Sequence, residues 1–197
     1  MRRFLEIGGI AAGVVLIAFG IGSLVLSVQG KSTVKDSLKQ EKIVGSPDMN
    51  PDAIAAEAKA AGLTDVDVPD CSVDGESIDT GNEARCFASY MRIHALEASG
   101  GKTYSEMPRF ATEDGKGTND AAQAQLDANG QPVSNAARDL WVTETALSTA
   151  LNTAYMADQL GNFGLVVGIA LILAGVGFII LALGGALRRN EAGPPAA

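Results

Sequence analysis

The sequence is poor in the residue types from which most catalytic and metal centres are built. Its 197 residues include one histidine, His94, together with two cysteines, one tryptophan and only 5% aromatic residues. One histidine excludes a metal centre of two histidines and one carboxylate within a single chain, and the sequence has no G-x-S-x-G motif of a serine hydrolase. We expect His94 to be a packed or surface residue, and we expect no enzymatic activity, catalytic residue, metal ligand or cofactor.

Basic residues are also scarce. Lysine and arginine number 15 against 23 aspartates and glutamates, which gives a formal net charge of -8. Binding to a phosphate backbone requires clustered basic side chains, so no nucleic-acid partner is expected. The mean hydropathy is nevertheless +0.15. Because so acidic a chain is usually more polar, we infer that the net charge and the mean hydropathy are averages over two parts of the chain, one apolar and one acidic.

Two long stretches, within residues 7–28 and 163–187, contain no charged residue and are almost wholly apolar or small. About 20 helical residues cross a bilayer core of roughly 30 Å, so both are long enough to span it. A cleavable signal peptide is the alternative for the first stretch. Its apolar run exceeds the usual length, however, and its end, SVQGKS, has no Ala-x-Ala site. We predict transmembrane helices over 7–28 and 161–187.

Basic residues flank the two spans on their outer sides. Arg2 and Arg3 precede the first span, and Arg188 and Arg189 follow the second. Both termini are therefore expected in the cytoplasm, although four lysines just after the first span keep the inverted topology as an alternative. We predict a multi-pass protein of the plasma membrane. Its parts are a cytoplasmic N-terminus (1–6), an extracytoplasmic domain (29–160) and a disordered cytoplasmic tail (188–197).

The two cysteines lie between the spans. Cys71 and Cys86 are separated by a turn-rich segment, which favours a disulfide in an oxidising compartment; two free thiols are the alternative. The same region holds an acidic stretch, 64–79, with six carboxylates and no basic residue. Calcium binding is one interpretation of it, but the spacing does not match an EF-hand loop, and we expect a solvated acidic loop.

Helix signals recur through the region between the spans. The first helix is predicted to continue through 32–44, and Asn50 is a candidate N-cap for a short alanine-rich helix. Thr80 and Glu83 have the spacing of a capping box at the start of a third helix. The turn-rich stretch 102–135 is expected to wrap around the helices. The fold class predicted is an all-α membrane protein, a two-helix transmembrane hairpin carrying a mostly helical, bundle-like extracytoplasmic domain.

A long final helix, capped by Ser134 or Asn135, is predicted to enter the membrane without a break. One position of a seven-residue (heptad) repeat in this helix is occupied by Leu140, Leu147, Ala154, Gly161, Gly168, Gly175 and Ala182. The first span has small residues at the same spacing, Gly13, Gly20 and Ser27. Small residues allow helix backbones to approach closely in lipid, so we predict an antiparallel hairpin; homodimerisation through the same stripes is the competitor. The packing residues predicted are Gly9, Gly13, Gly20, Gly161, Gly164, Gly168 and Gly175.

Four segments together carry a resemblance to a known group of proteins. They are LEIGGIAAGVVLIAFGIGSL, STVKDSLKQEKIVGSPDMNPDAI, YSEMPRFATEDGKGTND and ARDLWVTETALSTALNTAYMADQL. This combination resembles uncharacterised actinobacterial envelope proteins with two transmembrane helices, some of which carry an automatic label of aromatic ring-opening dioxygenase. The resemblance implies a location in the envelope and no established activity, and the single histidine does not support the dioxygenase label.

Two functional hypotheses follow. The first is a non-enzymatic structural or interaction subunit of a membrane complex, whose partners are the lipid bilayer and a membrane protein or further copies of this chain. The second is a domain that senses a ligand or cation and signals through a partner.

Overall fold

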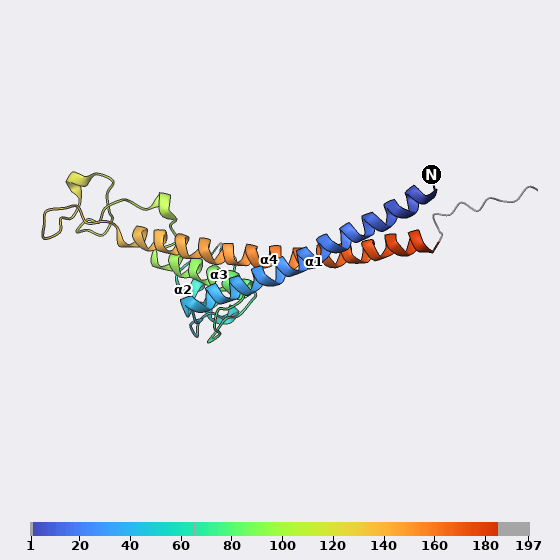
Figure 1. Cartoon of the computed structure of the whole chain (residues 1–197). Helices are drawn as coiled ribbons and strands as arrows, with labels where there is room; N and C mark the ends of the chain where they lie inside the picture. The colour runs from blue at the N-terminus through green and yellow to red at the C-terminus, as the bar shows by residue number, and fades with distance from the viewer. Residues whose placement is uncertain (1, 65, 185–197) are drawn as a thin grey trace, which may run out of the picture. The chain divides into compact units, whose positions relative to one another are not determined.

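The computed structural model describes residues 2–64 and 66–184 (Figure 1). Four α-helices dominate it: α1 (Arg2–Glu41), α2 (Pro51–Ala60), α3 (Gly81–Ala98) and α4 (Ala136–Leu183). Two short 3-10 helices, η1 (Tyr104–Glu106) and η2 (Ala121–Gln123), lie between α3 and α4. Within the described ranges there are isolated β-bridges but no strand. The prediction of an all-α fold is confirmed.

The chain divides into two compact units. Among the described residues, 2–33 and 158–184 form the first, which we call the two-helix unit, and 34–157 form the second, the helical domain. The predicted limits of the extracytoplasmic domain, 29 and 160, concern the membrane boundary and stay a prediction. The predicted tail, 188–197, including Arg188 and Arg189, lies outside the described residues.

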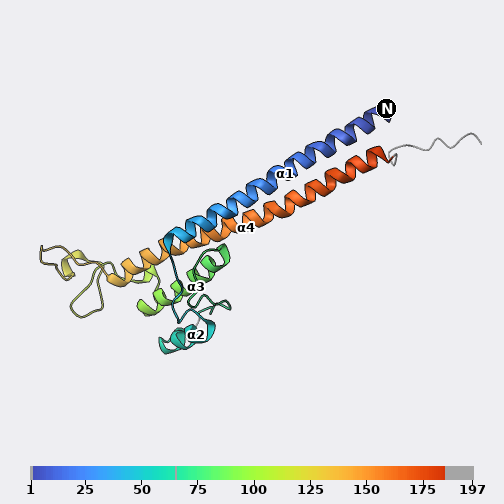
Figure 2. The ribbon, with the colours of Figure 1, turned by 60° about the horizontal axis from the view of Figure 1, so that its bottom comes forward.

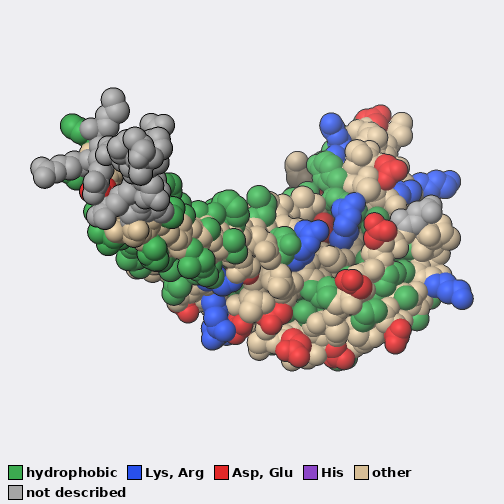
Figure 3. Space-filling view, turned by 90° about the vertical axis from the view of Figure 1, so that its right-hand side faces the viewer, with side chains coloured by type: hydrophobic (Ala, Val, Ile, Leu, Met, Phe, Trp, Pro, Cys, Tyr) green, Lys and Arg blue, Asp and Glu red, His purple; other side chains and the backbone are tan. Residues whose placement is uncertain are grey.

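The two-helix unit consists of the N-terminal part of α1 and the C-terminal part of α4, which lie side by side (Figure 2). The helices have 40 and 48 residues, as expected for spans that continue beyond the apolar stretches. Only 11% and 17% of their most apolar windows are buried, so most large apolar side chains point outward. Figure 3 shows hydrophobic side chains over this unit and charged ones on the helical domain. By length and composition, both helices are able to cross a membrane.

The predicted caps organise the helical domain. The Asn50 side chain accepts a hydrogen bond from the Ala53 N–H at 3.0 Å, which starts α2. At the start of α3, the Thr80 hydroxyl accepts from the Glu83 N–H at 3.3 Å, and the Glu83 carboxylate accepts from the Thr80 N–H at 2.9 Å. The capping box is therefore confirmed, and both helices begin where local hydrogen bonding predicts.

The core of the helical domain gathers around α3. Tyr90 and Ile93 of α3 are fully buried, and the Tyr90 hydroxyl donates to the Cys71 carbonyl oxygen at 2.6 Å. Burial raises the pKa of Tyr90, so the hydroxyl remains a donor at neutral pH. The main core cluster consists of Leu38, Met49, Ile54, Ala58, Val73, Ile78, Ala84, Cys86, Phe87, Ala88, Tyr90, Ile93 and Leu151. All four helices thus contribute to one core.

The turn-rich segment before α4 does not wrap around the helices, contrary to expectation. Figures 1 and 2 show residues 108–135 extending beyond the N-terminal end of α4. The segment pairs with itself: the Ala111 N–H donates to the Val133 carbonyl, and the Gln125 N–H donates to the Ala111 carbonyl, both at 2.9 Å. Its backbone groups are satisfied locally, and it has few large apolar side chains to bury on a helix.

The heptad phase predicted for α4 does not extend to its first turns. Leu140 is 45% exposed, whereas Trp141 and Glu144 are 6% and 4% exposed. Trp141 packs with Ala95 and Met107 in a second core cluster. The larger indole determines which face of α4 is buried here, so the seam passes beside Leu140 rather than through it.

Candidate functional site

Glycines bring the two backbones of the two-helix unit into close approach. A Cβ atom on Gly13 would lie 2.6 Å from the Gly175 carbonyl oxygen, and one on Gly20 would lie 2.7 Å from that of Gly168. Real Cβ atoms essentially never come so near an oxygen, so any larger residue would push the helices apart. These glycine pairs recur one heptad apart, as expected for small-residue packing between antiparallel helices.

The remaining predicted packing glycines lie along the same helices. Gly164 faces Ser27, and its carbonyl accepts a hydrogen bond of 2.8 Å from the Ser23 hydroxyl. Gly161 lies against the aliphatic part of Lys31, where a Cβ atom would be 2.6 Å from Cγ. Gly9 is half-buried on α1.

A polar cluster ends the apolar part of this unit. The Lys31 ammonium lies 2.9 Å from Asp158 Oδ1 and 2.6 Å from Asn162 Oδ1. The Asp158 side chain is only 14% exposed, so the lysine compensates a carboxylate that has little contact with water. Lys31 and Asp158 are the charged residues that bound the two uncharged stretches. Their pairing therefore occurs where both apolar stretches end.

The cysteines form a disulfide, as predicted. Cys71 and Cys86 are bonded, with their Cα atoms 6.1 Å apart. The bond attaches the segment before α3 to α3 itself, next to the Tyr90 hydroxyl that also binds this segment. The acidic stretch around it stays largely exposed, and its last carboxylate, Asp79, pairs with Lys35 and Lys39 at 3.4 and 3.6 Å.

Arginines of α3 join it to α4. Arg85 lies over the Tyr155 ring at 5.1 Å from its centroid, and Arg92 lies over Trp141 at 5.3 Å. Between them, the buried Glu144 carboxylate accepts a hydrogen bond from the Ser148 hydroxyl at 2.7 Å. These contacts are of the kind that hold helices together.

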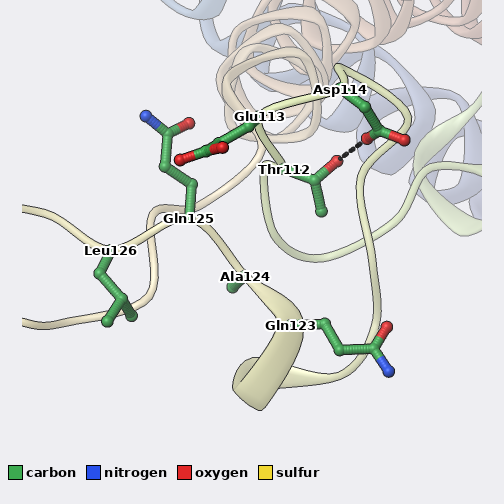
Figure 4. Close-up of a pocket in the computed structure, with 7 residues that line it drawn as sticks. All are labelled: Thr112, Glu113, Asp114, Gln123, Ala124, Gln125 and Leu126. Carbon is green, nitrogen blue, oxygen red and sulfur yellow. Dashed lines mark hydrogen bonds between the residues drawn. The ribbon is translucent and has the colours of Figure 1, made fainter.

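A hollow of about 690 Å³ lies in the turn-rich segment (Figure 4). Its lining consists of Thr112, Glu113, Asp114, Gln123, Ala124, Gln125 and Leu126. The Thr112 hydroxyl donates to Asp114 at 2.6 Å, which lowers the pKa of that carboxyl together with the Lys116 N–H. Asp114 is therefore ionised at neutral pH. The hollow offers hydrogen-bonding side chains, among them the carboxylates of Glu113 and Asp114.

His94 lies among carboxylates from separate parts of the helical domain. Its Nε2 atom is 3.4 Å from Asp48 Oδ2, and its Nδ1 atom is 3.9 Å from Glu57 Oε2. Asp48 belongs to the turn before α2, and Glu57 belongs to α2. A fourth residue, Glu97, lies one turn along α3, with its Oε2 also 3.9 Å from Nδ1. The ring is about one quarter exposed, so solutes reach it.

No family model, curated protein or solved structure matches this chain. Its function is therefore argued from its own residues.

Sequence reasoning missed the two polar clusters, at Lys31 and at His94. The position of Lys31 and Asp158 at the ends of the uncharged stretches was a usable signal for the first, since oppositely charged residues flanking an antiparallel hairpin come together. For the second, no local pattern links Asp48 and Glu57 to His94. Only the packing of α2 against α3 brings these side chains together.

Proposed function

We propose that this protein is a non-enzymatic integral membrane protein in which α1 and α4 cross the bilayer as a hairpin. The observation that carries the proposal is the arrangement of the two-helix unit. Glycines and serines bring the backbones together along its inner seam, while most of the large apolar side chains face outward and remain exposed. A soluble protein buries such residues in its core, whereas lipid accepts them at no cost.

The proposed orientation places both termini in the cytoplasm and the helical domain outside it. The arginines at positions 2 and 3 support this orientation through the positive-inside rule. The Cys71–Cys86 disulfide supports it independently, since such bonds persist in oxidising compartments.

Labelling of single introduced cysteines tests this topology. Asn129→Cys places a thiol on an exposed turn of the helical domain, and Ala197→Cys places one at the C-terminus. The native cysteines are bonded to each other and do not compete. In intact cells, a membrane-impermeant maleimide is expected to label Asn129→Cys and to label Ala197→Cys only after permeabilisation. The reverse pattern would establish the inverted topology, and labelling of both would refute a two-span hairpin.

The role that we propose is that of an accessory or interaction subunit of a membrane complex. Among the described residues, the side chains that come together are those that pack helices, close a disulfide or form ion pairs. The helical domain exposes most of the acidic stretch 64–79. On the first turns of α4 it also exposes the apolar side chains of Leu140 and Val142, which are 45% and 52% exposed. These exposed side chains are available for contact with a partner protein.

Affinity purification in a gentle detergent tests this role. A C-terminally tagged chain is expected to elute with a stoichiometric membrane partner or as a multiple of its own mass of 20.2 kDa, measured by light scattering. Untagged cells processed identically supply the control. A chain that elutes alone as a monomer at every detergent concentration would overturn the proposal.

Sensing of a ligand or cation by the helical domain is the second candidate. It is favoured by the grouping of Asp48, Glu57 and His94, which comes from three separate segments and faces solvent. The two candidates differ in readout, because a sensor is stabilised by its ligand even when no partner is present.

A further inference from the structure

The cluster around His94 combines ligand atoms that suit a metal ion. One atom from each of Asp48, Glu57 and His94 lies within 4.8 Å of the other two. Ligands of a tetrahedral zinc ion lie roughly 3.3 Å apart, because the bonds are about 2.0–2.2 Å long. Closing the cluster around an ion therefore requires side-chain movements of about 1.5 Å or less. The Glu57 side chain, which is 37% exposed, has the rotamer freedom for this change.

The charge of the cluster also favours a cation. Asp48, Glu57 and Glu97 surround a single imidazole, and within the described chain no lysine or arginine pairs with any of the three. The Asp48 Oδ1 atom is shielded from solvent and has no hydrogen-bond partner among the described residues. Buried carboxylate oxygens are normally satisfied, so Oδ1 is free to accept a donor or an ion, while Oδ2 is the oxygen that faces His94.

We propose that Asp48, Glu57 and His94 bind one divalent transition-metal ion of the zinc class. The imidazole nitrogen distinguishes this donor set from a calcium or magnesium site, since those ions prefer oxygen ligands alone. Three protein ligands leave a fourth position for water or for Glu97. The proposal names the ligand of the sensing candidate, but it depends neither on the membrane topology nor on a partner.

The surroundings of the ring fit a metal ligand. Carboxylates lie on both sides of it, Asp48 at Nε2 and Glu57 with Glu97 at Nδ1. An ion held by His94 Nε2 together with Asp48 and Glu57 would leave the Nδ1–H facing Glu97. Such a contact fixes the orientation of metal-binding histidines in proteins. The ion would join the turn before α2, α2 and α3, and would stabilise the helical domain by binding only its folded form.

Zinc titration of the full-length protein tests the proposal. The protein is purified in detergent without a polyhistidine tag, treated with a chelator and titrated with Zn²⁺ by calorimetry. We expect a saturable isotherm with one ion per chain, and a rise in the thermal unfolding midpoint at saturating zinc. His94→Gln and Glu57→Gln are each expected to weaken the affinity by at least about tenfold, as expected for loss of a ligand.

Matched variants separate the site from general binding to acidic surface. Glu76→Gln removes an exposed carboxylate of the same type outside the cluster and is expected to leave the isotherm unchanged. A variant counts as folded when it retains the disulfide and the metal-free unfolding midpoint. If His94→Gln does not fold, the zinc affinity of Glu57→Gln tests the site. The absence of saturable binding to the unmodified chain, or equal affinity in the unmodified chain and the folded variants, would overturn the proposal. Failure to find a membrane partner would not affect this result.

Discussion

Replacement of both Cys71 and Cys86 by alanine is expected to lower the free energy of unfolding of the helical domain by about 3 kcal/mol. The disulfide closes a loop with a sequence separation of 15, which restricts the unfolded chain. Trp141 is the only tryptophan and is buried in this domain, so its fluorescence reports the transition during denaturant unfolding. The expected loss is a large fraction of the 5–15 kcal/mol that stabilises a typical domain.

The unmodified protein in reducing conditions provides the control for this experiment. Its unfolding midpoint is expected to fall to that of the double alanine variant. The midpoint of the variant is expected to be the same with and without reductant. Coincident midpoints for the oxidised unmodified protein and the double variant would show that the bond contributes nothing to stability. The Tyr90 hydrogen bond to the Cys71 carbonyl would then suffice to hold the segment.

Substitution of Gly20 by leucine is expected to separate the helices of the two-helix unit by about 2 Å and to destabilise their packing by about 1–3 kcal/mol. The reason is the missing space: a Cβ atom on Gly20 would already lie 2.7 Å from the Gly168 carbonyl oxygen. Spin labels attached at Val14→Cys and Val176→Cys report the distance between the two helices by pulsed electron paramagnetic resonance. Both positions face outward and are 55% and 42% exposed.

Gly22→Leu is the matched control, because a Cβ atom on Gly22 meets nothing within 4 Å. It makes the same chemical change two residues along the same helix and is expected to leave the distance unchanged. Equal distance distributions in the two variants would contradict the glycine-mediated packing. Dilution with unlabelled protein distinguishes homodimerisation, since only a distance between two copies of the chain disappears on dilution.

The features predicted successfully from sequence depend on neighbouring residues. Asn50 and the Thr80–Glu83 capping box act through hydrogen bonds that reach three residues along the chain. The apolar character of the two long helices is likewise visible in consecutive residues. The disulfide was predictable for a different reason: with two cysteines in the whole chain, only one intramolecular pair exists.

Predictions that depended on which surfaces meet were less successful. The heptad phase placed Leu140 in the seam, but the bulk of Trp141 rotates the buried face of α4 at its first turns. The turn-rich segment was expected to cover helices. Its backbone N–H and C=O groups instead pair with one another, so the segment needs no contact with a helix. In both cases the outcome depends on competing packing arrangements that have no periodic signature.

The sequence by itself determined the helical class, the helix starts, the cysteine pair and the two apolar helices, because hydrogen bonding and hydropathy operate along a few consecutive residues. Only the tertiary structure decided which side chains from distant positions share a site. The Lys31–Asp158 pair joins residues 127 positions apart, and the cluster at His94 unites a turn, α2 and α3. Such pairs form because the core packs the helices in one register, and that register is a property of all the packed side chains together.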